Sequence, residues 1–400
     1  MKTPDPLGGV PCFEGHLDIA YNALFHEREA TWSVDLTRRR ELGLADAEAE
    51  LPPEIAPMED GRGLCTVSLP ELRASGVAVA VTTLLGRAKP WVLPTRPGAL
   101  AGGDWPTQRM AHALAYAHLA YYRSLEDAEQ VTIIRRRADL EAVWDRWSGA
   151  AEAERATLPI GLIVTMECAD PIEDPDQLRA WWEGGLRAIF LTHFGQGHYA
   201  AGNPSSDPDN RDDLDGPVTE RGRSLLRAME SLGPSGMPLD LTHTSDTSFW
   251  DAVDRYRGPI YSSHSNCRAL CDDQRQLTDA MIRAIAERDG VLGVVLANPM
   301  IRADLIRGPR WRPESHGVTF EHLADHIDHI CQLVGDAHHV AIGSDADGGF
   351  GAESCPHGFD RYRDLRGLVD VLSARGYGDE QLRDIFGRTW LNFYRRVLPA

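Results

Sequence analysis

The sequence predicts an α/β fold, a single (β/α)8 (TIM) barrel domain over residues 1–400. Three observations favour it: eight short apolar runs typical of strands, helix-like stretches between most of them, and metal-competent side chains where several runs end. Alternating strands and helices form a parallel sheet, and eight such strands can close into a barrel. The runs VAVAVTTLL and GVLGVVLA are continuously apolar, as expected of parallel strands that are covered on both faces.

The elements follow one another in a regular order. The expected strands are Cys12–Asp18, Val77–Leu85, Leu158–Glu167, Arg187–His193, Pro238–His243, Pro259–Ser265, Gly290–Leu296 and His339–Asp345. The helices expected before the third to the eighth strand are Thr107–Ser124, Gln177–Gly184, Thr219–Leu232, Phe249–Tyr256, Thr278–Arg288 and Thr319–Leu333.

Three segments are longer than ordinary connections, namely Arg38–Arg62, Arg87–Pro106 and Gly195–Pro217. The second and third follow strand ends, so we expect them at the C-terminal face of the strands, as walls of a substrate site. We find no linker or internal repeat that would separate a second domain.

Composition narrows the class of partner. Apolar residues make up 42% and charged residues 25%, as in an ordinary soluble globular protein. The net charge of −19 and the lack of a long basic patch argue against nucleic-acid partners. We find no apolar signal segment and no run near the ~18 residues of a membrane span, so we expect a cytoplasmic protein without membrane contact. Seven scattered cysteines without a CxxC pair indicate free thiols.

A histidine and an aspartate lie two residues apart at the end of the first strand. His16 and Asp18 flank Leu17. Because side chains alternate faces along a strand, both point into the same space, the mouth of the expected barrel. One imidazole and one carboxylate on one face suit a divalent ion such as zinc.

Later strands end in side chains of the same chemistry. Glu167 ends the third strand, His243 the fifth, His264 the sixth and Asp345 the eighth. Each could be a turn residue. A metal-competent group at the same end of five strands instead predicts one shared metal centre.

Two neighbouring cations need a bridging anion. Lysine occurs only at Lys2 and Lys89, and neither ends a predicted strand, so Glu167 rather than a lysine carbamate is the expected bridge. Two close cations lower the pKa of a shared water towards neutrality and clamp the substrate oxygen. His193, which ends the fourth strand, is either a further ligand or, as we prefer, a donor to the developing oxyanion.

Other histidines are better explained without a metal. His322, His326 and His329 share one face of the helix before the eighth strand, which is expected outside the barrel and away from its mouth. Two loop histidines on the active face stay open as ligands: His198 and His316.

With these residues in hand, the chain resembles the membrane (renal) dipeptidase family of the amidohydrolase superfamily, in its bacterial soluble branch. The resemblance covers nearly the whole chain. It rests on GHLD around His16, SLPELRASGV at Ser68–Val77, MECADPI at Met166–Ile172, FLTH at His193, LDLTHTS around His243, SSHSNCRAL around His264, RQLTD at Arg275–Asp279, HIDHI, and AIGSDADG around Asp345.

The resemblance implies a barrel with two Zn2+ ions per chain. His16 and Asp18 would bind the first ion, and His243 and His264 would complete the second. Glu167 would bridge them.

The resemblance also implies the groups that handle the substrate. His193 would polarise it, Arg275 would hold its carboxylate, and Asp345 would be the acid beside the shared water. Two features depart from the family. Cys168 stands where a glycine often follows the bridging glutamate, so a narrower site is expected. The segment LANPMIRAD after the seventh strand has no counterpart of the tyrosine of animal members.

The sequence therefore predicts a binuclear zinc dipeptidase acting on small dipeptides, L-Xaa-D-Xaa among them. Manganese, cobalt or iron could replace zinc. One alternative is an amidase or lactamase of the same superfamily, acting on N-acyl amino acids or cyclic amides, which the missing tyrosine and altered loops favour. A second is a non-catalytic metal-binding barrel, against which Asp345 argues, since metal binding alone would not require it. The family further implies a homodimer.

Overall fold

The computed structural model describes residues 7–44, 50–52, 61–89, 104–204, 215–303, 305 and 317–400. Seven parallel strands form one sheet in the order β1-β2-β6-β7-β8-β9, with β5 paired to β6. Two further pairs are β10-β11 and β3-β4. The strands are β1 Cys12–Leu17, β2 Val77–Leu85, β3 Arg87–Ala88, β4 Asp104–Trp105, β5 Val131–Ile133, β6 Ile160–Glu167, β7 Leu186–Phe190, β8 Leu239–Asp240, β9 Ile260–Tyr261, β10 Leu292–Val294 and β11 Val340–Ile342.

The expected α/β fold with parallel strands is confirmed. Each expected strand has a counterpart, in the order β1, β2, β6, β7, β8, β9, β10 and β11. Of these, β2 alone has the predicted bounds; β1, β6 and β7 are one or two residues shorter, and the strands from β8 onwards are shorter still. At β8 and β9 the reason is Asp240, whose Oδ1 accepts the N–H groups of Thr242 (3.0 Å) and Ser263 (3.1 Å). A side chain thus takes amide hydrogens that a longer ladder would use.

The sheet is curled, and the β10-β11 pair lies between its two ends. A parallel bridge joins Ser262 to Leu292 beside β9, and Asp345 N–H donates to His16 O (3.3 Å) beside β1. Close packing here needs glycine, because a Cβ on Gly293 would lie 1.7 Å from Ser263 O. The described residues therefore form a curled half-barrel of parallel strands and a strand pair bridging towards β1.

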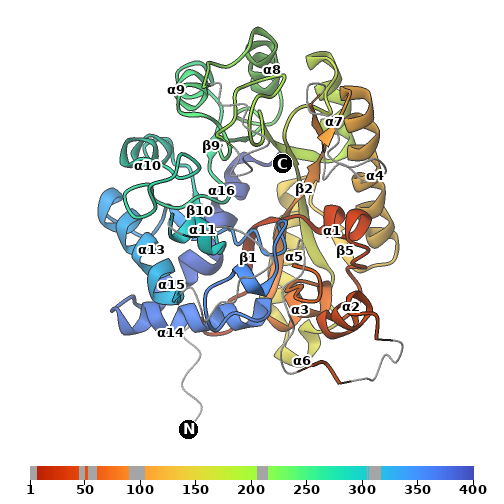
Figure 1. Ribbon diagram of the computed structural model, residues 1–400, viewed down its shortest axis with the longest axis vertical. Coiled ribbons are helices and arrows are strands. Elements are labelled where there is room, and N and C mark those ends of the chain that lie inside the picture. The colour runs from red at the N-terminus through yellow and green to blue at the C-terminus, as the bar shows by residue number, and fades with distance from the viewer. Residues whose placement is uncertain are drawn as a thin grey trace.

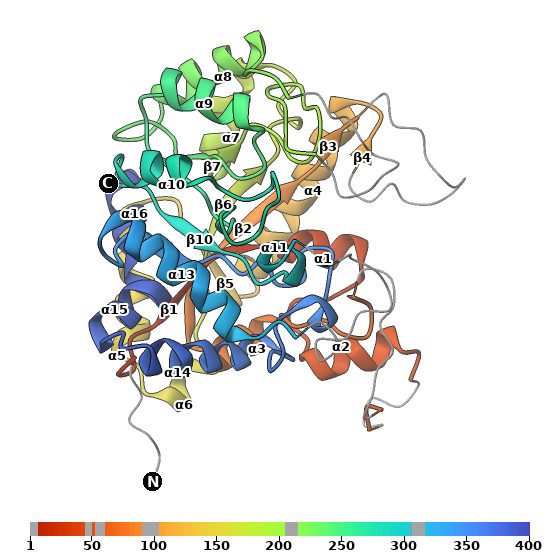
Figure 2. The ribbon, with the colours of Figure 1, turned by 60° about the vertical axis from the view of Figure 1, so that its left-hand side comes forward.

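Helices surround the strands (Figures 1 and 2). The expected helices correspond to α4, α7, α8, α9, α10 and α13. Several begin at a hydroxyl residue that accepts a backbone N–H, such as Thr219 from Gly222 (3.0 Å), which is a favoured N-cap. The helices are α1 Ile19–Phe25, α2 Val34–Glu41, α3 Leu69–Ala74, α4 Gln108–Asp127, α5 Arg137–Gly149, α6 Glu152–Arg155, α7 Leu178–Gly184, α8 Glu220–Glu230, α9 Asp246–Arg255, α10 Asp279–Ala286, α11 Asn298–Ile301, α13 Phe320–Val334, α14 Arg366–Ala374, α15 Asp379–Arg383 and α16 Thr389–Val397.

Shorter helical turns complete the described part of the chain. They are the 3-10 turns Pro175–Gln177, Ala352–Ser354 and Tyr362–Leu365, and the π-helical turn Asp384–Arg388. Within the described ranges, none of the helices combines the length and apolarity that a membrane crossing requires.

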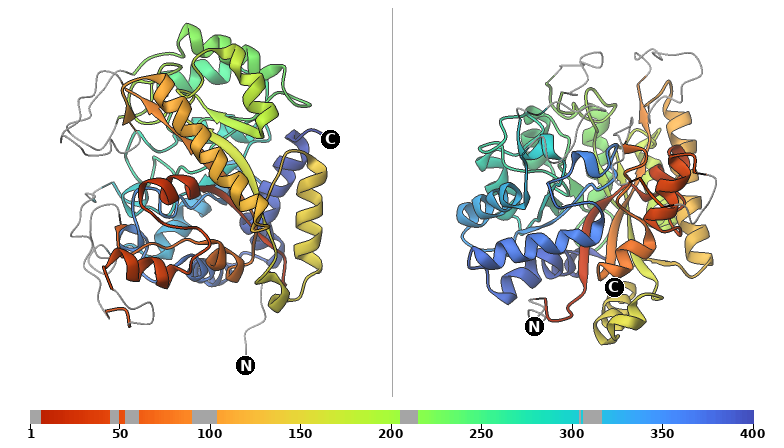
Figure 3. Two further views of the ribbon diagram at one scale, coloured as in Figure 1. Left: turned by 90° about the vertical axis from the view of Figure 1, so that its right-hand side faces the viewer. Right: turned by 60° about the horizontal axis from the view of Figure 1, so that its bottom comes forward.

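The C-terminal helix packs against the first strand. Trp390 of α16 donates from Nε1 to Ile342 O (2.8 Å). A Cβ on Gly15 would lie 2.6 Å from the Trp390 ring, so the ring packs directly on the β1 backbone. Figure 3 (left) shows α16 beside α5, and α4 along the outside of the sheet. The first and last parts of the chain thus share one core below the strand ends.

Candidate metal centre

The predicted ligands lie at the carboxyl ends of parallel strands. His16 lies near the end of β1, Asp18 follows that strand, and Glu167 is the last residue of β6. The other four each follow a strand by three residues: His193 after β7, His243 after β8, His264 after β9 and Asp345 after β11.

Glu167 lies at the centre of this cluster. Its Oε1 is 3.3 Å from His243 Nε2, 3.6 Å from His193 Nε2 and 3.7 Å from His264 Nε2. Its Oε2 is 3.6 Å from His16 Nε2. One carboxylate therefore faces histidines on both of its sides.

A second group of acids surrounds His16. Its Nε2 lies 3.7 Å from Asp345 Oδ1 and 4.0 Å from Asp18 Oδ1. Thr83 of β2 donates its hydroxyl to Asp18 Oδ1 and orients that carboxylate. Potential ligand atoms lie within 4.8 Å of one another in three sets: His16, Glu167 and His264; Glu167, His193 and His243; His16, Asp18 and Asp345.

Burial controls the charge state of these side chains. The pKa of Glu167 is raised well above its ordinary value, first by burial and then by the nearby charges of Asp18 and Asp345. Burial lowers the pKa of His16 to about 3, with the Arg275 charge as a further cause. It also lowers those of His243 and His264 well below the ordinary value. The imidazoles are thus neutral and have lone pairs to offer.

The donor set fits divalent metal ions. Neutral imidazoles and carboxylates are ligands that zinc accepts. His16 Nε2 and Glu167 Oε2 are buried and have no hydrogen-bond partner among the described residues, although each faces the other ligands. Acids placed this close in a buried site repel one another unless cations lie between them.

Several residues of the centre adopt left-handed backbone conformations. φ is 67° at His243, 55° at Asp345 and 87° at Cys168, directly after Glu167. Such conformations cost on the order of 1 kcal/mol or more for residues other than glycine, and they concentrate at functional sites. The chain holds these side chains in place at the expense of backbone strain.

The other two residues expected to handle the substrate, besides Asp345, also lie here. The His193 ring is 4.0 Å from that of His243, centroid to centroid. Arg275 is buried and donates from Nη1 to Ser265 Oγ (2.8 Å) and from Nη2 to His264 O (2.7 Å). It therefore supports the His264 segment in addition to facing the cluster.

Two supporting residues were not found from sequence. Glu14 is buried two residues before His16 on the same face of β1, and its Oε1 accepts the N–H of His16 (2.8 Å). The alternation along the strand could have revealed it. Arg87, whose Nη1 lies 2.9 Å from His193 Nδ1, has no such signal, because it comes from a different segment of the chain.

The other histidines lie apart from the cluster. His326 is buried, with Cys267 N–H on Nδ1 (3.1 Å) and Ile301 O near Nε2 (3.1 Å), which agrees with a structural role. His329 pairs with Asp279 (2.8 Å), and His198 Nδ1 lies 3.1 Å from Asp170 Oδ1. His316 lies outside the described residues.

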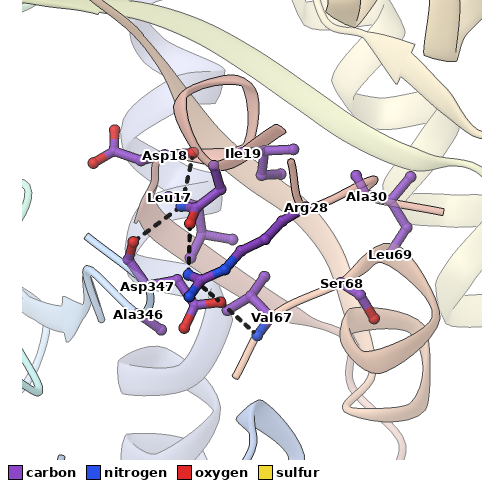
Figure 4. A pocket seen from close by; sticks show the side chains of 11 residues that line it. Leu17, Asp18, Ile19, Arg28, Ala30, Val67, Ser68, Leu69, Ala346 and Asp347 are labelled. Carbon is purple, nitrogen blue, oxygen red and sulfur yellow. Dashed lines mark hydrogen bonds and ion pairs between the residues drawn. The ribbon is translucent and has the colours of Figure 1, made fainter. Parts of the chain in front are cut away.

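A small, partly open pocket adjoins Asp18 (Figure 4). Arg28 reaches into it and donates to Asn22 Oδ1 (2.8 Å), while Asn22 donates to the backbone oxygens of Asp18 (3.1 Å) and Asp347 (2.9 Å). The Asp347 carboxylate accepts the N–H of Val67 (3.0 Å). This network holds the backbone on either side of the cluster.

Comparison with known proteins places the chain in a family. The family described as membrane dipeptidase (Peptidase family M19) matches residues 10–399. A Klebsiella pneumoniae protein, "Uncharacterized protein in pqqA 5'region", is 31% identical over 227 residues, 55% of this chain and 75% of the relative. Dipeptidase 3 of Rattus norvegicus is 24% identical over 274 residues, 67% of this chain and 51% of the relative.

The fold is shared with solved structures. A metallopeptidase from Rhodobacter sphaeroides, liganded with a phosphinate mimic of the dipeptide L-Ala-D-Ala, aligns with a TM-score of 0.70 and 22% identity, over 97% of this chain and 99% of that one.

The family match, together with a donor set that could hold metal ions, defines the protein as a metal-dependent hydrolase. The chain belongs to the membrane dipeptidase family, Peptidase family M19. The family expected from the motifs is thereby confirmed.

Proposed function

We propose that this protein is a dipeptidase with two zinc ions that cleaves small dipeptides. The position of Glu167 carries the proposal. Its Oε1 faces His243 (3.3 Å) and His264 (3.7 Å), and its Oε2 faces His16 (3.6 Å). His16 and Asp18 would hold one ion and the two later histidines the other, with Glu167 shared between the ions.

When bound, the two cations would supply a shared water of near-neutral pKa and polarise the substrate carbonyl. The same ligands could take manganese, cobalt or iron. Zinc is proposed because imidazole and carboxylate ligands suit it.

Side chains around the cations would stabilise the developing charge and transfer protons. His193 would donate from Nε2 to the carbonyl oxygen as that oxygen gains charge. Asp345, with Oδ1 3.7 Å from His16 Nε2, would take a proton from the attacking water and pass it to the leaving amine. These roles require both groups to touch the substrate from the same side as Glu167.

Arg275 would pair with the C-terminal carboxylate of the dipeptide. Its Nη atoms already hold Ser265 and His264, while its Nε has no hydrogen-bond partner among the described residues. A guanidinium has five N–H groups, so donors remain for a substrate. A free carboxylate beside the scissile bond would then limit the enzyme to short substrates.

The chirality of the substrate is part of the proposal. We propose that L-Xaa-D-Xaa dipeptides are among the substrates, with support from the ligand of the Rhodobacter sphaeroides structure. An amidase or lactamase activity is the second candidate. After β10, Asn298 donates to Cys355 O (2.7 Å), and the segment LANPMIRAD that contains it has no tyrosine to share the carboxylate with Arg275.

The architecture around the centre is proposed in the same way. We propose that the chain is one domain whose strands close as a (β/α)8 barrel, with β10 and β11 between β9 and β1. The Ser262–Leu292 bridge and the hydrogen bond from Asp345 N–H to His16 O support closure. The homodimer and the cytoplasmic location stay predictions.

The first test is a dipeptide panel. Zinc-loaded protein, with a chelator-treated control, is assayed on L-Xaa-L-Xaa and L-Xaa-D-Xaa dipeptides and on N-acyl amino acids that lack a free amine. Chelator-sensitive turnover of dipeptides supports the proposal. Turnover restricted to the N-acyl compounds favours the amidase, and no turnover with two bound metals favours a non-catalytic barrel.

Two variants test the assigned roles. Arg275→Ala should raise KM strongly, whereas Asp345→Asn should mainly lower kcat. Arg227→Ala is a control, because the Arg227 side chain is 64% exposed and pairs with Glu220 on α8 (3.8 Å). A wild-type KM in the Arg275 variant would remove the carboxylate-binding role.

A further inference from the structure

We propose that Arg87 is a positioning residue that keeps the ring hydrogen of His193 on Nε2. The inference rests on the proposed function, because it assigns the state of the histidine that acts there as a donor. Arg87 Nη1 lies 2.9 Å from His193 Nδ1, although 106 positions separate the two residues.

The direction of this hydrogen bond follows from the chemistry of the two groups. A guanidinium can only donate, and it stays charged in proteins. Nδ1 of His193 must therefore be the acceptor. A neutral imidazole with a bare Nδ1 carries its hydrogen on Nε2.

The surroundings of Arg87 fix its direction. Its β3 segment pairs with β4, where Asp104 Oδ1 lies 2.6 Å from Arg87 Nε. The next residue, Ala88, donates its N–H to the buried Asp170 (2.9 Å). Lys89 then donates from Nζ to Phe194 O (2.6 Å), directly after His193. Arg87 and Lys89, from one short segment, thus hydrogen-bond to His193 and to the next residue, Phe194.

The hydrogen on Nε2 decides between two roles for His193. Nε2 lies 3.6 Å from Glu167 Oε1, close enough to belong to one of the possible ligand sets. A nitrogen that carries hydrogen has no lone pair for a metal, but it can donate to an oxygen that gains negative charge. Arg87 therefore reserves His193 for the substrate and leaves the metal ions to His16, His243 and His264.

The tautomer can be read directly by NMR. Full-length protein is labelled in both histidine ring nitrogens and loaded with zinc, and the His193 signals are assigned from their loss in His193→Gln. We expect a bare Nδ1 and a hydrogen-bearing Nε2 in the wild type. In Arg87→Met, whose side chain is of similar length but cannot donate, we expect a mixture of tautomers.

A spin-active cadmium ion in place of zinc gives a second spectroscopic readout. Wild-type protein should show scalar coupling from cadmium to ring nitrogens of His16, His243 and His264 and none to His193. Coupling to His193, or a hydrogen on its Nδ1, would overturn the proposal. Neither result depends on finding a substrate, so the proposal can fail or stand independently of the dipeptidase assignment.

The kinetic constants of Arg87 variants distinguish a positioning role of Arg87 from a purely structural one. Arg87→Met should lower kcat about tenfold or more and change KM little, because one oxyanion donor is affected and substrate binding is not. Arg87→Lys keeps a cationic donor and should recover part of the rate. Arg109→Met is the control, since the Arg109 side chain is 86% exposed. If Arg87→Met misfolds, the wild-type spectra still decide; if it folds with an unchanged tautomer, the proposal is wrong.

Discussion

Glu14 accepts the backbone N–H of Ser344 at 2.8 Å, which joins β1 to the residue before Asp345 across 330 positions. The same Oε1 accepts the N–H of His16 (2.8 Å), and Oε2 accepts the Tyr362 hydroxyl. One buried carboxyl group thus sets the spacing between the first and last strands under the metal centre.

Removing this acceptor should destabilise both the fold and the centre. Glu14→Ala leaves three buried donors without a partner, and each costs about 1–3 kcal/mol, so we expect a loss of at least about 3 kcal/mol in unfolding free energy. Glu14→Gln keeps an acceptor oxygen and should lose much less. Urea unfolding of the metal-free proteins measures the difference. Equal losses in the two variants would contradict this account.

Metal removal should lower the thermal stability. Without cations, the buried carboxylates of Asp18, Glu167 and Asp345 repel one another, and any ion that binds only the folded state stabilises it by mass action. Zinc at a hundredfold excess over its Kd should add about 2.7 kcal/mol per site. Thermal unfolding with zinc and with chelator measures the effect. In Glu167→Gln, zinc should raise the melting temperature only slightly. A zinc-independent melting temperature in the wild type would be inconsistent with a metal centre.

Replacement of Cys168 by glycine should leave the protein more stable than replacement by alanine. Its φ of 87° lies in the left-handed region, which glycine adopts without the steric penalty of a Cβ. Both variants lose the thiol, so their difference isolates the backbone term, and Cys168→Gly should be the more stable by about 1 kcal/mol. Chemical denaturation of the pair measures this difference. An alanine variant as stable as the glycine variant would show that the backbone is not strained.

His118 should contribute to acid sensitivity. It is buried on α4, its Nδ1 accepts Leu85 N–H (3.2 Å), and burial lowers its pKa to about 3. Below about pH 6.5, His118 is protonated in the unfolded chain but stays neutral in the folded protein until the pH nears 3. The folded protein therefore loses stability as the pH falls through this window.

The matched variant is His118→Gln, which keeps an acceptor for Leu85 and does not titrate. Between about pH 6 and about pH 5, its unfolding free energy should fall less steeply than that of the wild type, by about 1 kcal/mol per pH unit. Denaturation of metal-free protein at several pH values measures the slopes. Parallel curves would show that His118 is protonated in the folded state.

The sequence predicted the positions of the strands along the chain better than their lengths. β2 has the predicted bounds, Val77–Leu85, because nine consecutive residues are buried. β8 is shorter than predicted, since the Asp240 side chain replaces part of the ladder, a contact that no periodicity reveals. β5 was missed because its three residues, Val131–Ile133, are too few to show a pattern.

The residues predicted as metal ligands lie close together because each ends or closely follows a strand, and parallel strands bring such ends together. The groups that support them were harder to predict. Arg87 begins the long segment Arg87–Pro106, which was expected only as a wall of the substrate site, and its contact with His193 exists only once β2 and β7 are in place. Local patterns therefore predict which candidate ligands come together, whereas the residues that orient them depend on tertiary structure.

The link from Glu14 to Ser344 also bears on how the protein is made. A ribosome releases the N-terminus first, so His16 and Asp18 leave the exit tunnel long before Ser344 and Asp345 are synthesised. Until then Glu14 lacks two of its three donors, Ser344 and Tyr362, and the missing contacts are as non-local as almost any in the chain. Truncated chains would thus lack a complete site, and metal uptake should mark only those that have been synthesised almost to their end.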